Sequence, residues 1–98
     1  MAEKVYELLQ FKATEAWYQL SEEERKSFME KVAKKREEAG ALQLAGFAAY
    51  SSKWRSVRVF VFPNIDAYQK VATAYGPQGL KVQRYFDYDV TLGYEPPA

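Results

Sequence analysis

The segment WRSVRVFVF, residues 54–62, constrains the fold most because it is apolar on both faces of an extended strand. Its three valines would lie on one face, and Arg58, Phe60 and Phe62 on the other. A strand whose sheet is covered by helices on one side only usually alternates apolar and polar residues. This segment therefore predicts a sheet that must be covered on both faces.

Three further segments are rich in β-favouring residues and predict strands. They are residues 4–13, 41–52 and 81–92. The second and third strands are close in sequence, which predicts a hairpin that turns near residues 51–53. The tail GYEPPA is expected to end the last strand, because proline cannot donate a ladder hydrogen bond.

Two segments predict helices, residues 21–39 and 64–75. Ser21 and Glu24 have the spacing of a capping box at the start of the first helix. Asn64 is a typical N-cap for the second. A glycine follows each helix, as is common at helix C-termini.

The element order β-α-β-β-α-β predicts a ferredoxin-like α+β fold in a single domain, residues 1–98. In this two-layer sandwich both helices pack on one face of a four-stranded antiparallel sheet. The other face would expose a large apolar surface, so we expect it to pack against a second copy of the chain. Such a homodimer would close an α+β barrel with a small interior.

Charged side chains on apolar faces need partners. Arg25 and Arg36 fall on the apolar arc of the first helix. The valine face of residues 54–62 suits packing under helices, so Arg58 and its two phenylalanines are expected to face the partner molecule. Asp87, on the last strand, would then offer Arg58 a carboxylate.

The stretch YELLQFKATEAWYQLSEEE, with the later IDAYQKV and RYFDYDV, resembles the dimeric α+β-barrel superfamily. The resemblance is closest to the small darcynin-like proteins and more distant to the chlorite dismutase branch. It implies a homodimer whose sheets face each other. It also places Trp17 and Leu20 at one end of the sheet, where Trp17 either closes the barrel mouth or packs on the first helix.

Composition excludes several functional classes. The chain has no cysteine, so it forms no disulfide, and a cytoplasmic location is the simplest expectation. It has no histidine, so it departs from the haem-binding branch, and no metal or other cofactor is expected. The net charge of +1 and the lack of a long apolar run predict neither a nucleic-acid partner nor a membrane partner.

The first functional hypothesis is a protein that binds a small aromatic or polyketide-like molecule in the barrel, with or without a chemical step. Arg58 and Asp87 are the candidate catalytic residues: Arg58 could stabilise an enolate or phenolate, and a carboxylate such as Asp87 or Glu7 could transfer a proton. The candidate ligand-binding residues are Gln10, Trp17, Gln43, Phe47, Phe60, Phe62 and Tyr85.

Two alternatives come from other classes. One is a non-catalytic structural or interaction protein whose own aromatic side chains fill the barrel. The other is a single-stranded RNA binder, because RVFVF resembles the aromatic motif of RNA-recognition domains, which share this element order. The glycines of that motif are missing and the charge is balanced, and both features argue against RNA.

Overall fold

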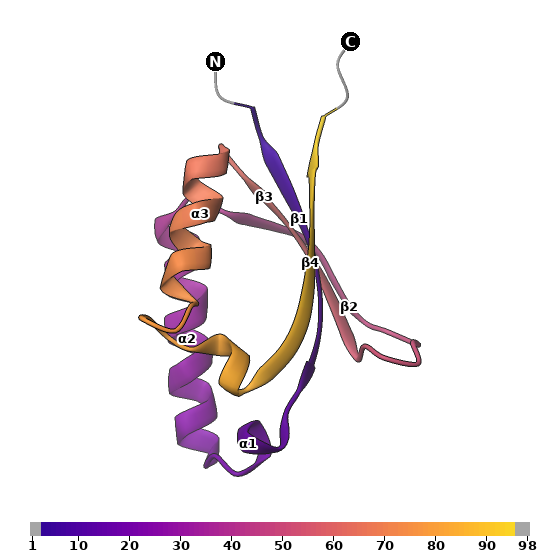
Figure 1. Ribbon diagram of the computed structural model, residues 1–98, viewed down its shortest axis with the longest axis vertical. Helices are drawn as coiled ribbons and strands as arrows, with labels where there is room; N and C mark the ends of the chain where they lie inside the picture. Colours follow the sequence, from indigo (N-terminus) through magenta and orange to yellow (C-terminus); the bar gives the residue numbers. More distant parts are fainter. Residues whose placement is uncertain (1–2, 96–98) are drawn as a thin grey trace.

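The computed structural model describes residues 3–95, which form a four-stranded antiparallel sheet with α2 and α3 on one side (Figure 1). In chain order the elements are β1 (Val5–Ala13), α1 (Glu15–Tyr18), α2 (Glu22–Glu38), β2 (Leu42–Ala48), β3 (Ser56–Phe62), α3 (Ile65–Ala74), the short 3-10 helix η1 (Val82–Arg84) and β4 (Phe86–Tyr94). The sheet order is β2-β3-β1-β4. The predicted ferredoxin-like α+β fold is therefore confirmed.

The capping predictions explain where the two long helices begin. The Ser21 side chain accepts a hydrogen bond from the Glu24 backbone N–H, and the Ser21 N–H donates to the Glu24 carboxylate, as a capping box requires. The Asn64 side chain accepts from the Ala67 N–H at 2.8 Å. Gly40 follows α2 with φ of 77°, a conformation that favours glycine.

The last strand differs from its predicted bounds at both ends. It begins later, because η1 occupies residues 82–84, and Thr14 accordingly donates its backbone N–H to the Tyr85 carbonyl oxygen at 2.8 Å. It also ends later, because Gly93 and Tyr94 still pair with β1. The expectation that the tail GYEPPA ends the strand at once is wrong for these two residues, and its prolines lie outside the described residues.

The predicted orientation of β3 is wrong. Phe62 pairs with Val5, and Phe60 with Glu7, so these residues share the face that carries the helices. Phe62 and Val5 are fully buried there against α3. A phenylalanine ring reaches across the gap between sheet and helices, which a valine is too short to fill. The three valines of β3 consequently lie on the face that has no helices.

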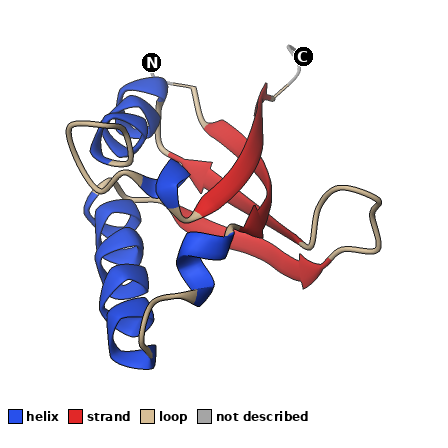
Figure 2. Ribbon diagram, turned by 60° about the horizontal axis from the view of Figure 1, so that its bottom comes forward, coloured by secondary structure: helices blue, strands red, loops and turns tan. Residues whose placement is uncertain are grey.

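This open face keeps the apolar surface that the sequence predicted, and β2 is exposed along its whole length. Leu42 is 66% exposed and Phe47 57% exposed, and Leu8 of β1 is also exposed. The β2–β3 loop projects beyond the rest of the sheet (Figures 1 and 2). Within residues 3–95, no helix is long and apolar enough to cross a membrane.

Candidate functional site

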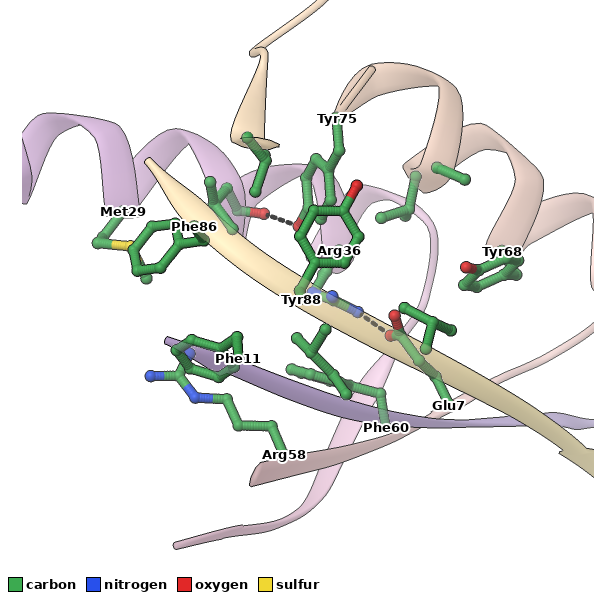
Figure 3. A pocket seen from close by; sticks show the side chains of 16 residues that line it. Glu7, Phe11, Met29, Arg36, Arg58, Phe60, Tyr68, Tyr75, Phe86 and Tyr88 are labelled. Carbon is green, nitrogen blue, oxygen red and sulfur yellow. Dashed lines mark hydrogen bonds and ion pairs between the residues drawn. The ribbon is translucent and has the colours of Figure 1, made fainter. Parts of the chain in front are cut away.

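A cavity of about 110 Å³ lies between the sheet and the two long helices (Figure 3). The sheet contributes Glu7, Leu9, Phe11, Arg58, Phe60, Phe86, Tyr88 and Val90, and the helical side contributes Met29, Val32, Arg36, Tyr68, Val71, Ala72, Tyr75 and Val82. The lining is mainly apolar and rich in aromatic rings, with a few charged and hydroxyl groups among them. Such a lining is typical of small-molecule sites.

An ion pair between Glu7 and Arg36 forms part of the cavity wall. The Arg36 Nη1 atom lies 2.5 Å from the Glu7 Oε1 atom, and the two side chains are 9% (Arg36) and 4% (Glu7) exposed. The guanidinium carbon also lies 3.8 Å from the centre of the Phe60 ring and 5.3 Å from that of Tyr75. The partner that Arg36 needed is therefore Glu7, and each charge is compensated by the other.

Tyr75 ties α3 to α2 at the cavity. Its hydroxyl donates a hydrogen bond to the Val32 carbonyl oxygen at 2.6 Å. Burial raises the pKa of Tyr75 to about 12, and the nearby Arg36 charge opposes this rise only in part. Burial also raises the pKa of Tyr68 on the same helix. Both hydroxyls consequently stay protonated at neutral pH and can act as hydrogen-bond donors or acceptors.

Arg58 is the second cation of the cavity, and its surroundings differ from those of Arg36. Its side chain is half-buried, and its guanidinium carbon lies 5.2 Å from the centre of the Phe11 ring. Among residues 3–95 it has no carboxylate within 4.0 Å and no side-chain hydrogen bond. Gly46 of β2 packs against its aliphatic stem. A cationic, five-donor group thus borders the cavity with no acceptor among the described residues.

An aromatic cluster closes the sandwich at the end where α1 lies. Trp17 packs on Phe86 with ring centres 4.8 Å apart, on Phe28 at 6.0 Å and on Tyr85 at 6.2 Å. Trp17 itself does not line the cavity, whereas Phe86 does. The α1 segment is also held by two hydrogen bonds, which the Arg25 side chain donates to the Trp17 and Tyr18 carbonyl oxygens. The geometry therefore matches the interpretation that Trp17 packs on the first helix.

The structure brings some of the predicted site residues together and separates others. Arg58 and Phe60 line the cavity, and Phe62 lies in the adjoining core. Trp17 and Tyr85 belong to the aromatic cluster at its end. Whether any of them binds a ligand stays a prediction.

Three predicted residues lie on the open face, which is the face that was predicted to line the barrel interior. Gln10 and Phe47 both pair with Val57 there, and Asp87 pairs with Lys12. The expected contact between Asp87 and Arg58 is therefore wrong, because the two side chains point to opposite faces of the sheet.

Gln43 and Phe47, both candidate ligand-binding residues, lie on opposite faces of the sheet. A β-bulge between Gln43 and Ala45 shifts the register of β2, so Gln43 pairs with Phe60 while Phe47 pairs with Val57. The Gln43 amide lies close above Gly46, beside the stem of Arg58.

Sequence reasoning missed Arg36 and Tyr75 as residues of the site. A signal was present, because Glu7 and Arg36 are opposite charges that both occupy apolar positions, one on a strand and one on a helix. Such a pair predicts that the Glu7 face of the first strand packs against the Arg36 face of the first long helix. This would have shown which face of β1 lies under the helices. Among residues 3–95, no cluster of three or more acidic side chains could hold a metal ion.

No family model matches the chain, and no curated protein matches it significantly in sequence. Solved structures resemble it in fold. A double mutant of the chlorite dismutase from Candidatus Nitrospira defluvii has a TM-score of 0.72 at 14% identity, over 100% of this chain and 43% of that one. A point mutant of SnoaB, a cofactor-independent oxygenase from Streptomyces nogalater, has a TM-score of 0.63 at 13% identity, over 99% of this chain and 97% of that one.

The chain thus has a ferredoxin-like α+β fold, as predicted, and shares it with these solved structures. It spans less than half the length of the chlorite dismutases that it matches and nearly the full length of SnoaB. At these identities the likeness establishes the fold alone. The narrower resemblance to darcynin-like proteins stays a prediction.

Proposed function

We propose that the chain binds a small aromatic molecule in the cavity between its sheet and its helices. The observation that carries this proposal is the cavity of about 110 Å³, whose walls are mainly aromatic and aliphatic and which adjoins fixed polar groups. Planar rings pack favourably on such walls, and a small number of polar groups fix the orientation of a ligand.

The polar groups are held in place before any ligand arrives. Glu7 and Arg36 hold each other, and Tyr75 is anchored to the Val32 carbonyl oxygen. Preorganised side chains lose little conformational freedom on binding, which favours affinity. A structural protein filled by its own side chains would not need a cavity at this position.

A ligand panel and a variant at the cavity edge test this proposal. One-ring and two-ring aromatic compounds should raise the melting temperature of the wild-type chain. Ala72→Phe adds a ring at a lining position on α3, and we expect it to weaken binding at least about tenfold. Thr73→Phe is the matched control, because Thr73 is exposed on the same helix and does not line the cavity. Equal loss in both variants, or no response across the panel, would count against the cavity.

The likeness to a cofactor-independent oxygenase of nearly the same length favours a second candidate, oxygen-dependent conversion of the bound aromatic molecule. Arg58 would then stabilise a phenolate or enolate of the substrate. Oxygen uptake with a panel of phenols and enolisable ketones tests it. Activity that Arg58→Gln abolishes supports the candidate, and no uptake with any compound argues for binding alone.

We also propose that the open sheet face packs against a second copy of the chain. Leu42 and Phe47 of β2 are more than half exposed, and they pair with Val61 and Val57 of β3. An apolar surface of this kind is unusual on a monomer.

The absence of cysteine supports a reducing compartment, and we place the protein in the cytoplasm.

A further inference from the structure

We infer that the ligand of this cavity is a one-ring aromatic carboxylate whose carboxylate pairs with Arg58. The inference rests on the proposed function and narrows it to one class of molecule. Two independent features of the cavity carry it, namely its size and its charge.

The size of the cavity fits a single ring. An apolar cavity of about 150 Å³ is known to accept benzene. The present cavity, at about 110 Å³, is of the same order. Aromatic side chains of the lining also contact each other, because Phe11 packs edge-on against Phe86 with ring centres 5.6 Å apart. A ligand ring between these walls would make the same kind of contact.

The charge of the cavity favours an anion. Glu7 and Arg36 compensate each other in a nearly fully buried pair, which leaves their net charge at zero. Arg58 adds one positive charge, and residues 3–95 give it no carboxylate within 4.0 Å. Its N–H groups make no hydrogen bond to the described residues, so a ligand carboxylate can accept charge-assisted hydrogen bonds from them.

The geometry of Arg58 favours a carboxylate over other anions of this size. Its planar guanidinium presents a fork of N–H donors that matches the two oxygens of a carboxylate. Its aliphatic stem lies beside Gly46, and its guanidinium lies near the Phe11 ring. In Figure 3, Arg58 and Phe11 lie together at one side of the cavity, away from the Glu7–Arg36 pair. The acidic end of a ligand would therefore lie at Arg58 and its ring against the aromatic walls.

Calorimetric titration with three probes tests the inference. Benzoate carries both the ring and the charge, benzamide carries the ring without the charge, and acetate carries the charge without the ring. We expect benzoate to bind wild-type protein at least about tenfold more tightly than benzamide, and acetate not to bind measurably. Arg58→Gln should remove the preference for benzoate while it retains the weaker binding of benzamide.

Arg55→Gln is the matched control, because Arg55 is exposed on the β2–β3 loop and its side chain donates only to the Ser51 carbonyl oxygen. It should keep the wild-type preference. Equal binding of benzoate and benzamide to wild-type protein would overturn the inference and leave the proposed function standing. Binding of neither aromatic probe would overturn both.

Discussion

Arg36 on α2 and Glu7 on β1 form a nearly fully buried ion pair, with the Arg36 Nη1 and Glu7 Oε1 atoms 2.5 Å apart. The pair joins the helix layer to the sheet at the wall of the cavity (Figure 3). Both charges are almost completely shielded from water, so each depends on the other. The pair consequently fixes which face of β1 lies under the helices.

Removal of one partner should destabilise the fold strongly. We expect Glu7→Ala to lower the free energy of unfolding by about 3–5 kcal/mol, because Arg36 would remain buried without a counter-charge. Glu7→Leu combined with Arg36→Met should recover most of the loss, since it removes both charges at once. Urea denaturation of the single and double variants measures both effects.

Lys35 provides a control on the same helix. Its ammonium nitrogen lies 3.8 Å from the Glu38 carboxylate, but both side chains are about half exposed. Lys35→Met should change the free energy of unfolding by at most about 0.5–1 kcal/mol. A cost at Glu7 as small as this control would show that the buried pair does not form.

The raised pKa of Tyr75 predicts a loss of stability at high pH. The unfolded chain releases this phenolic proton near pH 10, whereas the folded chain holds it until about pH 12. The associated stabilisation is complete below pH 10 and disappears as the pH rises toward 12, by about 2–3 kcal/mol. Tyr75→Phe should remove this decline, and it should cost about 1 kcal/mol at neutral pH through loss of the hydrogen bond to Val32.

Urea midpoints between about pH 8 and pH 11.5 for wild-type protein and Tyr75→Phe measure the difference. Tyr50→Phe is the control, because Tyr50 is fully exposed and should keep the wild-type profile. Parallel profiles for wild-type protein and Tyr75→Phe would contradict the burial of this hydroxyl.

Sequence patterns predicted α2, α3, the four strands and their order along the chain, because caps and alternation are local features, but they did not predict α1 or η1. Ser21, Glu24 and Asn64 act at short range, and each behaves as predicted. The orientation of β3 could not be chosen in this way, because valines and phenylalanines are both apolar. Only the packing of Phe60 and Phe62 against the helix layer decides between the two faces.

The residues of the cavity were predicted only in part, because the orientation of β3 was reversed. Arg58 and Phe60 were candidates and do line the cavity, but they were assigned to a chamber between two sheets instead of the cavity beneath the helices. Once β3 is reversed, Asp87 moves to the other side of the sheet from Arg58. The bulge at Gln43 has no sequence signature and separates Gln43 from Phe47.

Trp17 should stabilise the closed end of the sandwich without direct contact to a ligand. We expect Trp17→Leu to lower the free energy of unfolding by about 2–3 kcal/mol, because it loses ring contacts to Phe28, Tyr85 and Phe86. Tyr18→Leu, at an exposed neighbouring position, should have little effect. Equal effects of the two substitutions in thermal denaturation would contradict this role.

The open face should control association. We expect light scattering to report twice the chain mass of 11.3 kDa for wild-type protein at micromolar concentration. Phe47→Glu places a charge on the apolar surface and should give a folded monomer, whereas Tyr50→Glu on the exposed loop should remain dimeric. A wild-type mass of 11.3 kDa would contradict the proposed dimer without affecting the cavity.

Methyl NMR during titration with benzoate tests the binding site most directly, because an aromatic ring shifts the resonances of the methyl groups that it contacts. Leu9, Val32 and Val90 line the cavity, whereas Leu8, Val59 and Val61 lie on the open face of the same sheet. We expect the methyl resonances of the first three residues to shift and those of the second three to remain unchanged. Shifts confined to the open face, or no shift at saturating benzoate, would contradict the assignment of the cavity as the binding site.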